Sequence, residues 1–112
     1  MGNRKRYVNL GDPLISILTP TFNRPEWLKL TLQSLVEQSY SNWECIVIND
    51  AGMDVEFVVK EFKDSRIKYF TNEKNLDLAG TRNRAVDESS GDFYIVLDDD
   101  DGLMKETLEF RV

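Results

Sequence analysis

The most restrictive feature of the sequence is an apolar run at residues 93–97 that is followed at once by four aspartates at residues 98–101. Five residues are too few for a helix, and aromatic and β-branched side chains dominate the run, so it predicts a strand buried on both faces, as in a parallel sheet. Adjacent carboxylates repel one another and need either solvent or a cation. This stretch alone leaves two interpretations open: a solvated acidic turn, or a site for a divalent metal ion with oxygen ligands.

Strand and helix patterns alternate along the chain before this run. Apolar runs predict strands at residues 14–19, 43–48 and 67–70, and Pro20 is expected to stop the first of them. The spacing of apolar residues predicts helices at residues 25–38, 54–62, 77–88 and 103–111. Alternating strands and helices imply parallel pairing, with helices on both faces of the sheet. The predicted fold class is therefore α/β, with a Rossmann-like parallel sheet.

The composition bounds the class of protein. The chain has 112 residues and 41% hydrophobic residues, which corresponds to one globular domain at most. Its formal net charge of -6 argues against a general nucleic-acid binder, which would present a basic face. The chain has no histidine, which removes histidine-based acid–base catalysis and metal ligation. The single cysteine, Cys45, falls inside a predicted strand, and one cysteine cannot form an internal disulfide, which suits the cytoplasm.

The two ends of the sequence differ in character from the middle. Residues 1–13 form a basic tail with Arg4, Lys5 and Arg6, ahead of a predicted α/β domain at residues 14–112. Polar residues, glycine and proline interrupt any signal-peptide core, and no stretch reaches the roughly 20 apolar residues of a membrane span. We expect a cytoplasmic protein, with a peripheral role at the membrane surface left open. The last helical pattern runs to Val112 without a stop signal, so we expect a domain truncated at its C-terminus.

Polar residues follow three of the predicted strands at what should be one edge of the sheet. The first strand leads into Thr19, Pro20 and Thr21, the second into Asp50, and the fourth into residues 98–101. Ligands of open α/β sheets bind at the carboxyl ends of the strands. Asp50 alone would be typical of a turn or a helix cap, but this convergence favours a shared site. The sequence has no glycine-rich phosphate loop, so a metal held by the aspartates is the expected phosphate anchor.

Two arginines of the predicted helix at residues 77–88 receive different predictions. Arg82 shares one helical face with Leu78, Ala85 and Val86, so it should point toward the sheet. A buried guanidinium needs a carboxylate or phosphate partner. Arg82 is therefore expected either in a structural ion pair with a strand-end aspartate or in contact with a ligand. Arg84 should point elsewhere and be solvated.

Four motifs, in order, resemble those of the family 2 glycosyltransferases. They are ISILTPTFNR at residues 15–24, VIND at residues 47–50 with Asp54, NLDLAGTRN at residues 75–83 and LDDD at residues 97–100. The resemblance covers residues 14–112. It implies the nucleotide-binding half of a GT-A fold, in an enzyme that transfers a sugar from a nucleotide diphosphate donor to an acceptor, usually with Mn²⁺ or Mg²⁺.

The resemblance also implies roles for residues near the nucleobase. Pro20 and Thr21 would line the base pocket, and Asp50 would accept a hydrogen bond from the base. Arg82 would lie beside the base and the Asp-x-Asp element.

The acidic run would serve the rest of the donor. By the same resemblance, Asp98 and Asp99 would contact the ribose and the donor sugar, and Asp100 would hold the metal between the phosphates. The role of Asp101 is open. The family carries its catalytic base and acceptor site further along the chain than this sequence extends, so the catalytic residue is unknown here.

The sequence departs from the family pattern at three places. Asn49 stands where an aspartate is common, and residues 51–53 read Ala-Gly-Met where Gly-Ser-Thr is usual. Asp77 occupies a position where glycine is frequent. These differences bear on nucleobase preference more than on the fold.

Other functions stay open at this point. The partners implied by the resemblance are a nucleotide-diphosphate sugar and a carbohydrate or lipid-linked acceptor. A non-catalytic nucleotide-binding fragment is the main alternative, because the chain ends early. A nucleotidyltransferase would use similar metal chemistry but should carry a glycine-rich basic loop after the first strand, which residues 21–24 are not. A sheet edge exposed by truncation would favour homo-oligomers.

Overall fold

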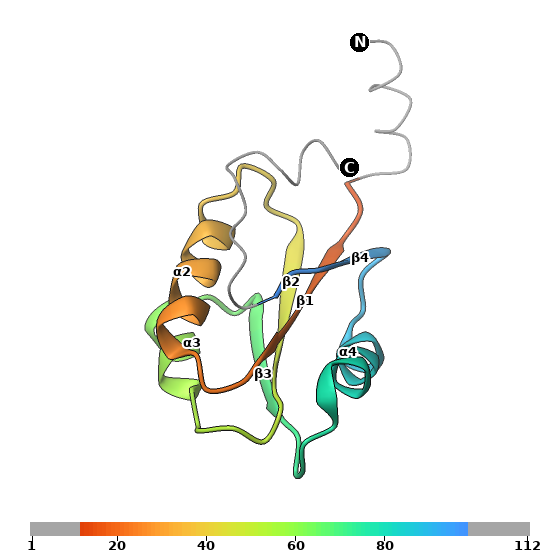
Figure 1. The fold of residues 1–112 in the computed structure, drawn as a ribbon. Coiled ribbons are helices and arrows are strands. Elements are labelled where there is room, and N and C mark those ends of the chain that lie inside the picture. The colour runs from red at the N-terminus through yellow and green to blue at the C-terminus, as the bar shows by residue number, and fades with distance from the viewer. Residues whose placement is uncertain (1–11, 99–112) are drawn as a thin grey trace.

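The computed structural model describes residues 12–98, in which strands and helices alternate (Figure 1). The elements are β1 (Ile15–Thr21), α2 (Pro25–Val36), β2 (Trp43–Asn49), α3 (Glu56–Glu61), β3 (Ile67–Thr71), α4 (Asp77–Glu88) and β4 (Phe93–Val96). The predicted order is confirmed, although α2 and α3 are each shorter than predicted. The basic tail up to residue 11 and the helix predicted at 103–111 lie outside the described residues.

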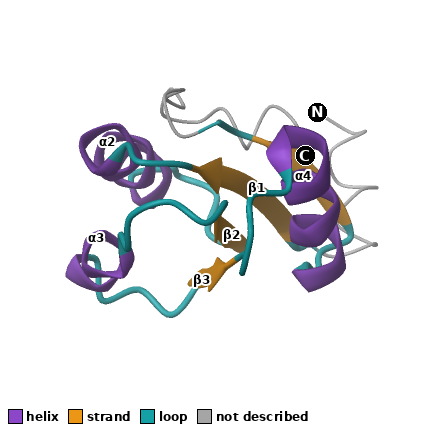
Figure 2. Cartoon of the chain, turned by 60° about the horizontal axis from the view of Figure 1, so that its bottom comes forward, coloured by secondary structure: helices purple, strands orange, loops and turns teal. Residues whose placement is uncertain are grey.

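The four strands form one parallel sheet in the order β3-β2-β1-β4. Thr21 pairs with Asn49, and Asn49 pairs with Thr71, so β1, β2 and β3 end level with one another. The predicted convergence of strand ends at one edge is therefore present. Figure 2, in which the lower edge of Figure 1 is turned toward the viewer, shows α2 and α3 on one side of the sheet and α4 on the other.

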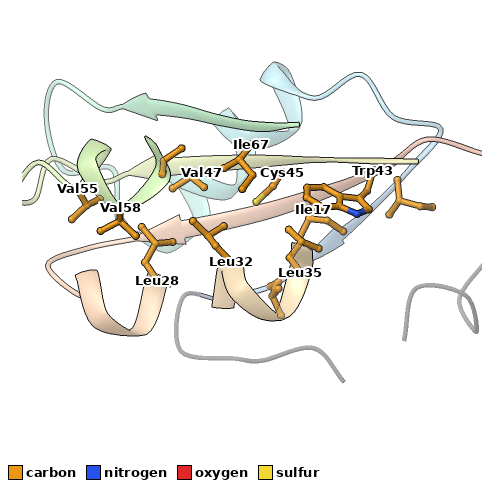
Figure 3. Close-up of a cluster of buried hydrophobic side chains, with 13 residues drawn as sticks. Ile17, Leu28, Leu32, Leu35, Trp43, Cys45, Val47, Val55, Val58 and Ile67 are labelled. Atoms are coloured by element: carbon orange, nitrogen blue, oxygen red, sulfur yellow. The ribbon is translucent and has the colours of Figure 1, made fainter. Parts of the chain in front are cut away.

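Each face of the sheet has its own hydrophobic core. Leu28, Leu32 and Leu35 of α2 are fully buried against Ile17, Trp43 and other side chains of the sheet (Figure 3). On the opposite face, Leu18 of β1 and Ala85 of α4 belong to a smaller buried cluster. Successive side chains of a strand point to opposite faces, which is why neighbours such as Ile17 and Leu18 serve different cores. The α/β fold with helices on both faces is thus confirmed.

Pro20 does not stop β1, contrary to the prediction. The strand continues to Thr21, and Pro20 pairs in register with Ile48. The carbonyl of Leu18 accepts a hydrogen bond from Leu97 N on the β4 side, and Pro20, two residues further, faces the same side. Because β4 ends at Val96, the missing N–H of Pro20 falls beyond the ladder and costs no hydrogen bond there.

The strand β4 is not buried on both faces, which corrects the prediction made from its apolar run. Phe93 and Tyr94 are 63% and 58% exposed, and only Leu97, just after the strand, is fully packed. Within the described part of the chain, β4 is an outer strand that pairs only with β1. Apolar composition predicted the strand correctly but could not tell a central position from an edge position.

A buried polar cluster holds the amino ends of the strands, at the opposite edge from the predicted site. The carboxylate of Glu44 accepts hydrogen bonds from Ser16 Oγ at 2.6 Å and Ser90 N at 2.6 Å, and from Lys68 Nζ at 2.9 Å. Gly91 N donates to Ser16 Oγ, and a Cβ at Gly91 would overlap that hydroxyl. The cluster therefore joins β1, β2, β3 and the turn before β4.

Among residues 12–98, no helix is both long and apolar enough to cross a membrane.

Candidate functional site

A cleft of about 450 Å³ opens at the carboxyl edge of the sheet. The residues that line it come from the end of β1, from the loops after β1, β2 and β3, from the first turns of α4 and from the segment just after β4. They are Pro20, Thr21, Phe22, Arg24, Asp50, Asn75, Asp77, Leu78, Thr81 and Asp98. Four of the residues predicted from sequence, Pro20, Thr21, Asp50 and Asp98, are therefore brought together in one cavity.

Asp50 is the most firmly held carboxylate of the cleft. Its residue is 8% exposed, and its Oδ1 accepts hydrogen bonds from Leu76 N at 2.7 Å and from Asn72 Nδ2 at 2.8 Å. Its backbone N donates to Thr21 O at 3.0 Å, and its carbonyl accepts from Asn75 Nδ2 at 3.4 Å. The sequence left two alternatives for Asp50, a structural role in a turn and a place in a ligand site. In the structure Asp50 does both, because it organises the turn and also lines the cleft.

The loop after β3 crosses the sheet edge to reach this carboxylate. Asn72 N donates to Asn49 O at 2.8 Å, which continues the strand pairing, and Leu76 N then bonds to Asp50. The loop delivers Asn75, Asp77 and the start of α4 to the cleft, although β2 and β1 separate β3 from β4 in the sheet. These lining residues were not among those predicted from sequence, although the rule that ligands bind at the carboxyl ends of strands, applied to β3, would have indicated them.

Arg82 lies at the rim of the site in an ion pair with Asp98. Its Nη2 is 3.5 Å from Asp98 Oδ1, and the two side chains are 40% and 41% exposed. The predicted partner is therefore present, but the predicted burial is wrong. The residues of α4 that are buried are Thr81 and Ala85, whereas Leu78 is half exposed. A half-exposed ion pair contributes about 0–1 kcal/mol to stability.

Arg84, expected to be solvated, is the arginine that the chain holds more tightly. Its Nη1 donates to Asn72 Oδ1 at 2.9 Å and to the carbonyl of Thr71. Its guanidinium also lies 5.7 Å from the ring centroid of Phe70, and its Nε is 3.7 Å from Glu88 Oε2. The prediction failed because α4 is rotated so that Thr81 and Ala85 face the sheet, which brings Arg84 against the end of β3.

Asn49 has a structural reason for replacing the aspartate that is common in the family. Its Oδ1 accepts from Gly52 N at 2.8 Å, while its Nδ2 donates to Met53 O at 2.7 Å and to Tyr69 Oη at 2.9 Å. A carboxylate has no N–H to donate, so an aspartate would set an unpaired charge against the Met53 carbonyl. In this chain the residue before Asp50 shapes the loop after β2.

The two remaining departures from the family pattern coincide with left-handed backbone. Ala51 has φ of 64° and Asp77 has φ of 60°, a region that glycine adopts without steric cost. Asp77 offsets part of this cost because its Oδ1 accepts a hydrogen bond from Gly80 N at 3.1 Å. Ala51 is exposed and carries no side chain that could compensate in this way.

The strained backbone at Ala51 predicts that Ala51→Gly stabilises the protein. Removing the steric strain of an alanine in the left-handed region should stabilise the folded state by about 1–2 kcal/mol. The greater conformational freedom of glycine stabilises the unfolded chain by about 0.4–1 kcal/mol, so the net increase in the free energy of unfolding is expected to be about 0.5 kcal/mol. The matched control is Ala79→Gly, at an exposed position in the first turn of α4, which should lose up to about 1 kcal/mol. Urea denaturation of both variants checks the prediction, and a lower midpoint for Ala51→Gly contradicts it.

The expected metal ligand cannot be placed, because Asp99 and Asp100 lie outside the described residues. Residues 12–98 contain no group of three or more acidic, histidine or cysteine side chains that could hold a metal ion. Asp98, which directly precedes them, lines the cleft, so the acidic run begins at this cavity. Mg²⁺ and Mn²⁺ both bind carboxylate oxygens, so the aspartates at residues 98–101 are compatible with either ion.

Sequence comparison relates most of the chain to enzymes of one kind. Residues 16–110 match the model of the family described as glycosyl transferase family 2. The chain is 39% identical over 104 residues to the Escherichia coli UDP-Glc:alpha-D-GlcNAc-diphosphoundecaprenol beta-1,3-glucosyltransferase WfgD, covering 92% of this chain and 41% of that enzyme. It is 37% identical over 100 residues to the Campylobacter jejuni GalNAc(5)-diNAcBac-PP-undecaprenol beta-1,3-glucosyltransferase, covering 86% of this chain and 32% of that one.

Structural comparison points in the same direction. TarS 1-349 of S. aureus in complex with UDP-GlcNAc superposes with a TM-score of 0.78 and 27% identity, over 87% of this chain and 29% of TarS. The mannosyltransferase PcManGT from Pyrobaculum calidifontis, at 20% identity and a TM-score of 0.71, shares the fold. The chain therefore spans less than half the length of the relatives that it matches.

Proposed function

Because this chain belongs to glycosyl transferase family 2, we propose that its cleft binds a UDP-sugar, from which the sugar is transferred to an acceptor. The observation that carries the proposal is the meeting of Pro20, Thr21, Asp50 and Asp98 in one cavity at the carboxyl edge of the sheet. Uridine is chosen because the name of WfgD includes UDP-Glc and the TarS complex contains UDP-GlcNAc.

In this proposal the nucleobase end of the donor lies between the first two strand ends. Pro20 and Thr21 line the base pocket, and the Asp50 carboxylate accepts a hydrogen bond from the base, as a pre-organised acceptor already fixed by Leu76 N. Arg82 stands beside this end and holds Asp98 in place through their ion pair. Asp98 and Asp99 contact the ribose and the donor sugar.

The diphosphate end of the donor requires positive charge, which the described lining supplies only sparsely. Arg24 lines the cleft, but so do Asp50, Asp77 and Asp98, so carboxylates predominate. Asp100 would hold Mn²⁺ or Mg²⁺ between the phosphates. A bound divalent ion would neutralise the diphosphate and stabilise the nucleoside diphosphate as it leaves.

The acceptor is proposed from the relatives rather than from the cleft. WfgD and the Campylobacter jejuni enzyme carry diphosphoundecaprenol or PP-undecaprenol in their names. A lipid-linked saccharide is accordingly the acceptor class that we propose, in the assembly of a cell-surface polysaccharide. A peripheral contact with the membrane would follow from such an acceptor.

The proposed donor site predicts metal-dependent binding of UDP. Isothermal titration calorimetry should show UDP binding that strengthens when Mn²⁺ is added, because Asp100 would hold the ion and the ion would supply positive charge to the diphosphate. Asp100→Ala should reduce the Mn²⁺-dependent affinity at least about 10-fold. The matched control is Asp87→Ala on the exposed side of α4, which removes the same charge. Equal Mn²⁺-dependent affinities for UDP in Asp100→Ala and the unmodified chain would refute the metal assignment.

A second measurement separates a donor-binding fragment from an active enzyme. Release of UDP from UDP-glucose in the presence of Mn²⁺ is measured for this chain and for a version lengthened to the size of its relatives. If both proteins bind UDP-glucose but only the longer one releases UDP, this chain is a donor-binding part without catalytic activity of its own. Turnover by the 112-residue chain would show that it carries its own catalytic base.

A further inference from the structure

Arg84 is connected to Asp50 through one intervening side chain, the amide of Asn72. Arg84 Nη1 donates to Asn72 Oδ1 at 2.9 Å, and Asn72 Nδ2 donates to Asp50 Oδ1 at 2.8 Å. Asn72 is only 6% exposed, so water competes little for this path. The hydrogen bonds run from a guanidinium on α4 to a carboxylate that lines the cleft, although Arg84 itself is not among the lining residues.

The amide of Asn72 can satisfy both neighbours in only one orientation. A guanidinium offers only donors and a carboxylate offers only acceptors, so the amide oxygen must face Arg84 and the amide nitrogen must face Asp50. The same nitrogen donates to Thr81 Oγ1 at 3.1 Å. Loss of Arg84 would leave a buried amide oxygen without its charged donor, which favours movement of Asn72 away from Asp50.

The position of Arg84 is itself set by the framework of the fold. Its Nη1 also donates to the carbonyl of Thr71 at the end of β3, and its Nε lies 3.7 Å from Glu88 on the next turn of α4. The guanidinium therefore fixes the loop that carries Asn72 relative to β3 and α4. This rigid connection is what a residue that orients another side chain requires.

We propose that Arg84 is a positioning residue that fixes the Asp50 carboxylate at the cleft through Asn72 and thereby sets how tightly the site holds a nucleobase. The part that concerns the nucleobase rests on the proposed function, in which Asp50 accepts a hydrogen bond from the base. The part that concerns Asp50 rests on the hydrogen bonds alone and can be tested without a ligand.

The ligand-free test is hydrogen exchange of the Leu76 amide, which donates to Asp50 Oδ1. In Arg84→Met, exchange at Leu76 should accelerate by about 10-fold more than exchange at Cys45, whose amide bonds to Arg66 O in the sheet and reports general destabilisation. Arg84→Lys retains a cation and a donor and should recover most of the protection. Lys74→Met removes a positive charge from the same loop and should leave Leu76 unchanged. Equal acceleration at Leu76 and Cys45 in Arg84→Met would overturn the proposal.

The ligand test compares UDP with inorganic pyrophosphate, each titrated in the presence of Mn²⁺. Arg84→Met should weaken UDP binding by about 10-fold and leave pyrophosphate binding unchanged, because only UDP has a base to reach Asp50. In an Asp50→Ala background, Arg84→Met should cause no further loss, because the carboxylate that Arg84 positions is already absent. Equal losses for both ligands, or losses that add in the double variant, would contradict the positioning role.

The two tests separate this inference from the proposed function. If the unmodified chain binds neither UDP nor pyrophosphate with Mn²⁺, the proposed donor site is wrong and the nucleobase part fails with it. The Leu76 exchange then still decides whether Arg84 positions Asp50. If UDP binds normally and Leu76 exchange in Arg84→Met matches the unmodified chain relative to Cys45, the proposed function stands and this inference is refuted.

Discussion

Glu44→Gln is expected to lower the free energy of unfolding by about 3 kcal/mol at neutral pH. Burial raises the pKa of the Glu44 carboxyl, but hydrogen bonds from Lys68, Ser16 and Ser90 outweigh burial and lower the pKa from 4.5 to about 2. The folded state therefore favours the ionised form strongly. A neutral amide keeps one acceptor but loses the charge that attracts Lys68 Nζ, 2.9 Å away.

The matched control for this variant is Glu61→Gln. Glu61 also has a lysine partner, since its Oε2 lies 3.3 Å from Lys29 Nζ, but both side chains are largely exposed. Exposed pairs of this kind contribute about 0–1 kcal/mol, so urea denaturation should place Glu61→Gln close to the unmodified chain. A loss for Glu44→Gln no greater than that for Glu61→Gln would show that the buried cluster is not stabilising.

The same cluster predicts how stability depends on pH. Because the pKa of Glu44 is depressed in the folded state, its contribution is complete above its ordinary value of 4.5 and is lost as the pH falls through about 2. The difference in unfolding free energy between the unmodified chain and Glu44→Gln should accordingly shrink between those two values. Denaturation curves at a series of pH values check this, and a constant difference throughout would contradict the assigned pKa.

Asp50→Ala should damage both stability and ligand binding. It removes the acceptor of Leu76 N and Asn72 Nδ2, and two hydrogen bonds to a charged group are together worth about 3 kcal/mol. The loop after β3 would lose its attachment to the sheet edge, and the cleft would lose a buried carboxylate. We expect Mn²⁺-dependent UDP affinity to fall about 100-fold, which corresponds to about 2.7 kcal/mol.

Two further variants make the Asp50 prediction specific. Asp92→Ala removes another carboxylate that accepts a backbone N–H, from Leu14 at 2.9 Å, but at the opposite edge of the sheet. It should cost about 1 kcal/mol in stability and leave UDP affinity unchanged. Asp50→Asn keeps an acceptor for Leu76 N and should recover most of the stability. Unimpaired UDP binding by folded Asp50→Ala, measured by calorimetry, would exclude Asp50 from the donor site.

Local pattern was sufficient to predict most of the fold. The four strands and the helices between them follow from apolar runs and helical spacing, which depend on near neighbours in the chain. Parallel pairing follows because each connection contains a helix. The meeting of Thr21, Asp50 and Asp98 at one edge then follows from geometry, since parallel strands end on the same side. The structure confirms each of these steps.

Tertiary packing alone decided which polar side chains the chain holds in place. Helical spacing predicted Leu78, Arg82, Ala85 and Val86 as the buried face of α4. Ala85 is buried as predicted, but the other buried residue of the helix is Thr81, while Leu78 and Val86 are exposed. Thr81 can be buried because Asn72, in the loop just before α4, donates to its hydroxyl, and the spacing of apolar residues along the helix does not reveal this contact.

Tertiary contacts also decided the exposure of β4 and the orientation of the Asp50 carboxylate. The sequence predicted that residues 93–97 form a strand, but its exposure depends on which neighbours flank β4 in space. It placed Asp50 at a strand end, but the hydrogen bonds that orient its carboxylate come from residues 22 and 26 positions away. Secondary structure follows from near neighbours along the chain, whereas burial and hydrogen-bond partners are properties of contacts between distant segments, and these exist only in the folded protein.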